Sequence, residues 1–278
     1  MNDRRTVVAV FAHPDDEVFS TGGTLARYAR EFHVVLVVAT RGELGEIRVP
    51  GIATPENLHE VREREVRASA RALGIHEVRF LDYRDSGMAG TPGNHDARSL
   101  LRADRDEAAG KVVAILRELG PEAVLTFEET GGYGHPDHIT VHQLTTAAFD
   151  AAVDPATFPE AGPVVELGRL FYSGFPRRLM RAIQEQARAS GADIGPLAQL
   201  DAERYGLPDE AIDVVIDVRD HVERKLAAFQ AHQTQFGDNQ LMTEMPEGHW
   251  RQLLEYEYFQ LARGEPLPGP RPAGTLLG

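Results

Sequence analysis

Two short stretches of the chain combine histidines with carboxylates at the same spacing. One reads AHPDDE and begins at Ala12, and the other reads GHPDH and ends at His138. The first places His13 three residues before Asp16, and the second places His135 three residues before His138. Imidazole nitrogens and carboxylate oxygens are common zinc ligands. Three such ligands from two loops, with one coordination position left to water, is the arrangement of a catalytic zinc site.

The residue inventory narrows the chemistry of such a site. The chain has no cysteine, so disulfides and thiolate ligands are excluded, and a metal must be held by His, Asp, Glu and water. Zn²⁺ suits a two-histidine, one-carboxylate set, and Fe²⁺ suits it as well. A bound metal acidifies water and polarises a carbonyl, and an unligated carboxylate can take the water's proton. A covalent mechanism is disfavoured, since the sequence lacks both cysteine and a Gly-x-Ser-x-Gly elbow.

Each motif follows an apolar run that predicts a buried strand, residues 6–11 before the first and 123–127 before the second. A single His-Pro-Asp could be a turn with a helix-capping aspartate. Two of them after strands of one parallel sheet are harder to explain in that way. Ligands bind outside the carboxyl ends of such strands, so we expect both motifs to face the same crevice.

Strands and helices alternate through the first 152 residues, which predicts an α/β, Rossmann-like fold. Its mostly parallel sheet should be flanked by helices, with a less regular C-terminal part. The predicted strands are 6–11, 34–39, 78–81, 123–127, 170–172 and 214–218, and the main predicted helices are 18–31, 58–73, 106–119, 138–152, 176–189, 220–235 and 249–263. We expect one domain over residues 1–263, with a core of 1–152, an elaboration of 153–263 and a Pro/Gly-rich, mobile or extended tail of 264–278.

Composition limits the partners. The 278 residues carry a formal net charge of −14, which argues against nucleic acid or an anionic membrane surface as partner. No signal peptide and no apolar run of about 20 residues is present, so a cytoplasmic location is expected. Association into a homo-oligomer stays open.

Together, the two motifs resemble the LmbE-like, or PIG-L, family of zinc-dependent N-deacetylases, which includes enzymes that remove acetate from N-acetylglucosamine conjugates. The resemblance covers most of the chain. Arg62 and Glu65, with the Leu-Gly at 73–74, resemble the family's first long helix. Residues 83–92 and 225–235 resemble the subgroup that acts on glucosaminyl-inositol and its thiol conjugates.

The resemblance implies a role for each motif residue. His13, Asp16 and His138 would bind zinc. Asp15 would be the general base that activates water, and His135 would stabilise the oxyanion or protonate the leaving amine. These roles supply every group that amide hydrolysis by water needs.

The remaining implied roles concern the surroundings of the reacting amide. Tyr133 would be a further donor over the substrate carbonyl, and Asp137 would orient His135. Arg62 and Asp85 would contact the sugar or inositol, Arg62 being suited to bidentate hydrogen bonding. No motif residue departs from the family's pattern.

The predicted function is therefore metal-dependent removal of an N-acetyl group from an N-acetylglucosamine conjugate, with an aglycone such as inositol or malate. One alternative is an amidase acting on thiol S-conjugates of the same scaffold. It would use the same chemistry and differ from the deacetylase only in the pocket for the acyl group. Another is a catalytically inactive, metal- or sugar-binding regulatory protein. The small-molecule amino sugar is the expected partner in each case.

Two further residues are ambiguous. Glu17 is expected to cap the helix that follows it rather than touch the metal. The pattern alone makes His232 an interhelix or surface histidine, whereas the resemblance makes the pocket rim an equal alternative.

Overall fold

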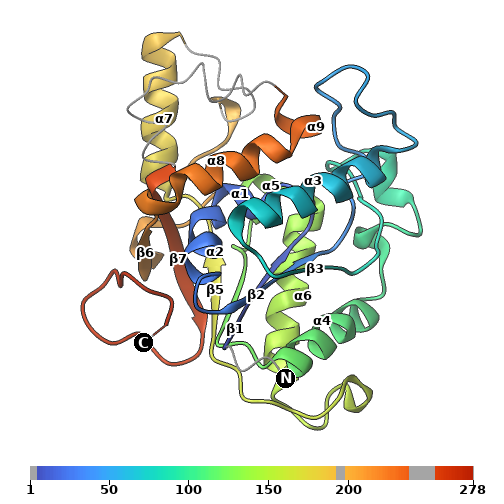
Figure 1. Cartoon of the computed structure of the whole chain (residues 1–278), viewed down its shortest axis with the longest axis vertical. Helices are drawn as coiled ribbons and strands as arrows, with labels where there is room; N and C mark the ends of the chain where they lie inside the picture. The colour runs from blue at the N-terminus through green and yellow to red at the C-terminus, as the bar shows by residue number, and fades with distance from the viewer. Residues whose placement is uncertain (1–4, 192–197, 238–253, 278) are drawn as a thin grey trace.

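The computed structural model describes residues 5–191, 198–237 and 254–277, and it contains a seven-stranded sheet in the order β3-β2-β1-β4-β5-β7-β6 (Figure 1). The first five strands of this order pair in parallel, and β7 pairs antiparallel with both β5 and β6. The strands are β1 (Thr6–Phe11), β2 (His33–Val38), β3 (Glu77–Phe80), β4 (Ala123–Phe127), β5 (Arg169–Ser173), β6 (Val214–Asp217) and β7 (Tyr256–Arg263). The predicted mostly parallel α/β fold is confirmed.

The central strands form the core because they carry side chains that avoid water on both faces. β1 and β4 are buried along their whole length, and β2 is buried after its first residue. Continuous runs of valine, leucine and alanine fit a parallel strand covered by helices on both sides. β3, at the edge, is only partly buried.

Helices cover both faces of the sheet. α2 (Gly22–Tyr28), α3 (Leu58–Leu73) and α8 (Val222–Ala231) pack against one another, and α4 (Arg105–Leu119) packs against α6 (Pro136–Ala152). Right-handed crossovers place the helices that join β1, β2 and β3 on the face opposite those that join β3, β4 and β5. The remaining helices are α1 (Asp16–Phe19), α5 (Gly131–Gly134), α7 (Arg177–Ser190) and α9 (Gln233–Phe236).

The C-terminal half differs from the sequence prediction in two places. The helix predicted for residues 249–263 is wrong where the structure describes it, because Tyr256–Arg263 is strand β7, while 249–253 lie outside the described residues. The helix predicted for 220–235 is interrupted at His232, which has φ −91° and ψ 60° and separates α8 from α9.

The chain after β7 runs through a series of bends, and it contacts the body of the protein. Leu276 is fully buried, and its N–H donates to the Tyr28 hydroxyl at 2.8 Å. Arg271 lies 3.0 Å from Asp213. Within the described residues no helix is long and apolar enough to cross a membrane. The division into core, elaboration and tail stays a prediction.

Candidate metal and hydrolase site

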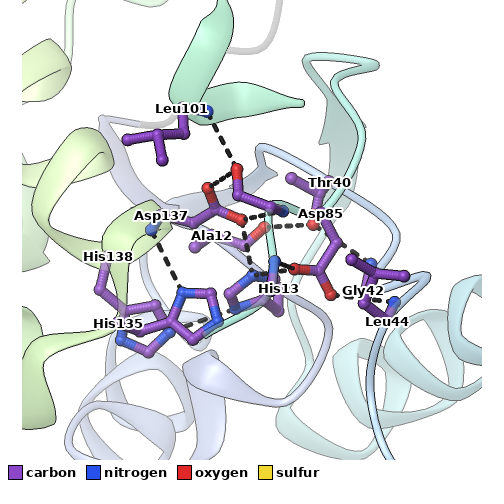
Figure 2. A network of polar contacts seen from close by, with 12 residues as sticks. Ala12, His13, Thr40, Gly42, Leu44, Asp85, Leu101, His135, Asp137 and His138 are labelled. Carbon is purple, nitrogen blue, oxygen red and sulfur yellow. Dashed lines mark hydrogen bonds and ion pairs between the residues drawn. The ribbon is translucent and has the colours of Figure 1, made fainter. Parts of the chain in front are cut away.

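The site lies where the carboxyl ends of β1 and β4 meet. These strands are neighbours in the sheet, and the chain proceeds from β1 to β2 on one side and from β4 to β5 on the other. Such a switch point opens a crevice in parallel sheets. His13 follows β1 directly, and His138 comes from the first turn of α6, after β4. The predicted convergence of the two motifs is therefore observed (Figure 2).

Three side chains with potential ligand atoms face one another at this point. Nδ1 of His13 lies 3.2 Å from Nε2 of His138 and 3.5 Å from Oδ2 of Asp16, and Oδ1 of Asp16 lies 3.2 Å from Nε2 of His138. Ligands bound tetrahedrally to zinc at about 2.0–2.2 Å lie roughly 3.4 Å apart, so the observed spacing fits such an ion. Burial alone would raise the pKa of Asp16, but His138 and His13 lower it well below its usual range. The carboxylate is thus kept in its ligating form.

The orientation of each imidazole is fixed through its other nitrogen. Nδ1 of His138 donates to the Gly131 carbonyl at 2.9 Å, which leaves the Nε2 lone pair for a metal, and its ring stacks on Phe127 at a centroid distance of 4.1 Å. Nε2 of His13 lies 3.2 Å from Oδ2 of Asp137. Hydrogen-bonded outer partners of this kind set the tautomer of metal-binding histidines.

Asp137 therefore holds a different histidine from the one expected. Its carboxylate contacts His13 and not His135, so the predicted orienting contact to His135 is wrong for the side chain. Both carboxylate oxygens also accept hydrogen bonds from Ser86, one from its N–H at 2.9 Å and one from its hydroxyl. The physical reason is that Asp137 lies in the first turn of α6 and points across the strand ends toward the loop that carries Ser86. His135 is contacted by the backbone N–H of Asp137 instead.

Two other groupings of possible ligands share His13. One adds His135 and His138, and the other adds Asp85 and Asp137. Asp85 and Asp137 lie beside Nε2 of His13, on the opposite side of the ring from His138, and their oxygens already accept backbone or hydroxyl donors. These two carboxylates are therefore better suited to orienting His13 than to binding a metal directly. In the grouping of His13, His135 and His138, a ring nitrogen of His135 lies within 4.8 Å of a ring nitrogen of each of the two predicted ligands.

Asp15 lies next to the ligands in a backbone conformation that non-glycine residues rarely adopt, with φ 115°. Its carboxylate accepts a hydrogen bond from Arg62 at 2.9 Å. Burial raises the pKa of Asp15 to about 6, while the charge of Arg62 acts in the opposite direction. A carboxylate whose pKa lies near neutrality is suited to accept and return a proton.

His135 is arranged as a neutral hydrogen-bond donor. Its Nδ1 accepts the backbone N–H of Asp137 at 3.2 Å and caps α6, so the proton of the neutral ring must be on Nε2. Burial, followed by the charges of His13 and His138, lowers the pKa of His135 to about 3. Its ring lies 4.6 Å from the His13 ring, which places the donor beside the predicted metal position.

Tyr133 closes the site on its solvent side. Its ring lies 5.1 Å from the ring of His138 and 6.1 Å from that of His135, and it is 46% exposed. Burial of the hydroxyl raises the pKa of Tyr133 above its usual value, so the group remains a donor at neutral pH.

The two predicted substrate contacts lie within the wall of the site. Arg62 is 2% exposed and donates to the carbonyls of Gly42 and Pro14 as well as to Asp15. Asp85 is also buried, lies 3.5 Å from Nε2 of His13, and accepts backbone N–H groups. Arg62 thus contacts Asp15, the predicted base, and Asp85 contacts His13, a predicted metal ligand. Their contact with a sugar or inositol stays a prediction.

Several residues of the site were not predicted from the sequence. Ser86, Phe127 and the carbonyl of Gly131 hold the motif residues, and Glu128 accepts hydrogen bonds from Thr130 and Gly132 in the loop before His135. Ser86 adjoins the predicted site residue Asp85, Phe127 ends a predicted strand and Glu128 follows it, whereas Gly131 lies further from both. Their closeness in sequence to the motifs and strand ends was the only signal that could have indicated a place in the site.

The structure decides among the alternatives for His232. It lies between α8 and α9 and is fully buried, so it is an interhelix histidine and lies neither on the surface nor on a pocket rim. Its Nε2 lies 2.7 Å from Oε1 of the buried Glu17, whose Oε2 accepts the N–H of Asp15 just before α1.

Comparisons with known proteins agree with this geometry. Residues 8–149 match the family described as PIG-L, GlcNAc-PI de-N-acetylase. A relative from Geodermatophilus obscurus, named 1D-myo-inositol 2-acetamido-2-deoxy-alpha-D-glucopyranoside deacetylase, is 40% identical over 95% of this chain and 94% of its own.

Two solved structures share the fold. An N,N'-diacetylchitobiose deacetylase from Pyrococcus horikoshii superimposes with a TM-score of 0.66 at 20% identity, over 93% of this chain and 84% of its own. A 4-carboxy-2-hydroxymuconate hydratase from Pseudomonas putida superimposes with a TM-score of 0.65 at 18% identity, over 96% and 99%. At these identities the likeness establishes the fold alone, and the hydratase illustrates that the fold serves more than one reaction.

Proposed function

Because the chain belongs to the PIG-L family, we propose that it hydrolyses the N-acetyl group of N-acetylglucosamine joined to inositol, using a bound divalent metal. The predicted family and the predicted class, a hydrolytic N-deacetylase, are confirmed. The choice of inositol as aglycone is supported by the name of a relative that is 40% identical over nearly the whole chain.

One observation carries the proposal. Nδ1 of His13, Nε2 of His138 and the carboxylate of Asp16 face one another at 3.2–3.5 Å. Both rings are fixed through their other nitrogens, which is the arrangement of a preformed metal site. The donor set suits Zn²⁺ and also Fe²⁺, and we propose zinc as the resident ion.

The side chains around these ligands supply the remaining groups that amide hydrolysis needs. When bound, the metal would acidify water and polarise the amide carbonyl. Asp15 accepts the proton of the attacking water, since its carboxylate adjoins the ligands and its pKa is about 6. His135 donates through Nε2–H to the oxygen on which negative charge develops. Tyr133 adds a second donor from the solvent side.

The route of the proton to the leaving amine follows from the same arrangement. Asp15 is protonated after water attack, and it is the group that can return this proton to the nitrogen as the C–N bond breaks. Acetate and the free glucosamine conjugate are then the products. Arg62, hydrogen-bonded to Asp15 at 2.9 Å, keeps the carboxylate directed at the reacting atoms.

A substrate panel tests the proposal. The protein would be loaded anaerobically with Zn²⁺ or Fe²⁺, and acetate release would be measured from N-acetylglucosaminyl-inositol, N-acetylglucosaminyl-malate, N,N'-diacetylchitobiose and a bulky thiol S-conjugate amide. We expect the highest kcat/KM with the inositol conjugate. Preference for the S-conjugate would favour the amidase alternative, and a metal-loaded protein inert on the whole panel would refute hydrolysis.

A further inference from the structure

A buried ion pair, Glu17 with His232, lies behind Asp15. We propose that this pair is a positioning device for the base: Glu17 holds the backbone of Asp15 in its unusual conformation, and His232 holds Glu17. The inference rests on the proposed function, because the device serves catalysis only if Asp15 is the base.

Asp15 needs such a device because its backbone is strained. With φ 115° and ψ −23° it occupies a region that side-chain-bearing residues rarely adopt and that persists only where surrounding contacts impose it. Two side chains supply those contacts. The N–H of Asp15 donates to Oε2 of Glu17 at 3.0 Å, and its carboxylate accepts from Arg62 at 2.9 Å. Glu17 therefore fixes the backbone, while Arg62 fixes the carboxylate.

Glu17 in turn depends on donors from elsewhere in the fold. It is fully buried, and a buried carboxylate is costly unless it is paired and hydrogen-bonded. Its Oε1 accepts the Ser69 hydroxyl from α3 and lies 2.7 Å from Nε2 of His232. Burial alone would lower the pKa of His232, but Glu17 and then Asp15 raise it above its ordinary value. The imidazole thus provides the compensating positive charge.

The backbone around His232 is shaped to deliver this ring. His232 occupies the break between α8 and α9, where its φ and ψ leave the helical region. Immediately after it, Thr234 is fixed to Glu65 of α3 through its N–H at 2.8 Å and its hydroxyl at 2.6 Å. The interruption of the helix therefore coincides with the residue of this segment that contacts the Glu17 carboxylate, 215 positions away in the sequence.

The ring of His232 makes no second hydrogen bond within the part of the chain that the structure describes. Its Nδ1 is buried and has no partner there. The polar contact of the ring is thus the one to Glu17.

One substitution and a matched control test the device. His232→Phe keeps a ring of similar size and removes the donor to Glu17. Gln233→Ala changes the exposed side chain next to His232 and leaves the contacts of Glu17 and Thr234 in place. We expect kcat of metal-loaded His232→Phe to fall about 10- to 100-fold with KM and metal content unchanged, and kcat of Gln233→Ala to stay near wild type.

Rescue by the conservative variant adds a second readout. Glu17→Gln keeps an oxygen that can accept the N–H of Asp15, so it should retain more activity than Glu17→Ala. Crystal structures of Glu17→Ala and His232→Phe should show the φ of Asp15 shifted away from its wild-type value. This readout does not depend on turnover.

The outcomes separate the two proposals. If the wild-type protein releases no acetate, the proposed function fails, and the conformation of Asp15 in the variant crystals decides the positioning role alone. An unchanged Asp15 backbone in both variants overturns the inference. An unchanged kcat in His232→Phe, or an equal loss of kcat in Gln233→Ala, overturns it as well.

Discussion

The two histidines of the GHPDH motif illustrate how residue environment decides chemical role. Both come from the start of α6, yet His138 uses Nδ1 to bind the Gly131 carbonyl, whereas His135 uses Nδ1 to accept the N–H that begins the helix. His138 therefore presents a lone pair, and His135 presents an N–H. The first suits a metal ligand, and the second suits an oxyanion.

Replacing His135 by asparagine tests the donor role. Asparagine can still cap α6, so the fold and the metal site should be preserved. Loss of the Nε2–H donor should lower kcat by about 10²- to 10³-fold with little change in KM, as expected for one oxyanion donor. Steady-state kinetics on the metal-loaded protein measure this. An effect on KM alone would contradict the assignment, and Glu129→Gln, which changes an exposed residue of the preceding loop, serves as control.

Metal binding should release protons near neutral pH. Burial alone would lower the pKa of His13, but Asp85, Asp137 and Asp16 raise it well above its ordinary value, so the metal-free ring holds its proton more strongly than a free imidazole does. Because the ligand must be neutral, the apparent metal affinity should rise with pH through this region. Calorimetric titration with Zn²⁺ in buffers of different ionisation enthalpy reports the released protons. A pH-independent affinity between pH 6 and 8 would contradict this account.

The sequence predicted which motif residues belong to the site. It predicted only some of the contacts that these residues make. Spacing and the strand ends predicted that the two motifs meet, and the family resemblance singled out His13, Asp16 and His138, which the structure brings together. The partner of Asp137 was not predictable, because Ser86 and Asp137 meet only once the loop after β3 folds over the strand ends. Such a contact depends on tertiary packing, which carries no local sequence signal.

At the scale of elements, the loop before α6 must adopt a shape that side chains would prevent. Gly131 has φ +64°, and a Cβ built on it would lie 2.5 Å from Cβ of His138. Glu128 fixes this loop by accepting the N–H groups of Thr130 and Gly132. The glycine thus allows the carbonyl of residue 131 to approach Nδ1 of the ligand.

Two alanine substitutions separate close approach from backbone strain. Gly131→Ala should displace His138 and lower metal affinity by about 10- to 100-fold, the cost of disturbing an outer partner. Gly132 has a similarly positive φ of +78° with ψ −51°, but open space around an added Cβ, so Gly132→Ala should cost stability alone, about 1–3 kcal/mol. Competition with a chromophoric chelator measures the affinities. Equal affinities in the two variants would show that close packing at Gly131 is unimportant.

Strand β7 shows why one element was mispredicted. Its burial alternates, with Glu257 and Phe259 facing inward and Tyr256 and Tyr258 partly exposed. A strand normally reveals itself by apolar residues on the buried face, but here a carboxylate occupies one buried position and aromatic residues lie outside. Apolar residues therefore lie on both faces of β7, and their alternation does not mark the buried face. The parallel strands, which are apolar throughout, were predicted closely.

At the scale of the whole molecule, the buried carboxylate of β7 joins the C-terminal elements to the first half of the fold. Glu257 accepts the N–H groups of Gly23 and Thr24 at the start of α2, and Nζ of Lys225 lies 2.6 Å from its Oε1. Both ionic side chains are fully buried. Strand β7, which lies next to the edge strand β6, is thus fixed to α2 and α8 through a single side chain. Figure 1 shows where these three elements lie in the fold.

Lys225→Met should destabilise the fold because it leaves the carboxylate of Glu257 buried without its cation. The expected loss is about 3–5 kcal/mol of unfolding free energy, whereas Asp150→Asn, which breaks an exposed pair with Arg263, should cost no more than about 1 kcal/mol. Urea denaturation followed by circular dichroism measures both. Equal midpoints for the two variants would contradict the importance of the buried pair.

The central claim is that Asp15 acts as the base of a metal-dependent N-deacetylase. Acetate release from N-acetylglucosaminyl-inositol, compared between wild type and Asp15→Asn at equal measured metal content, tests it most directly. We predict that wild type turns over, with an acid limb in kcat/KM at or below about pH 6, since Asp15 must be deprotonated. We predict that the asparagine variant keeps its metal and loses kcat by at least about 10²-fold. Full activity of that variant with bound metal would contradict the account.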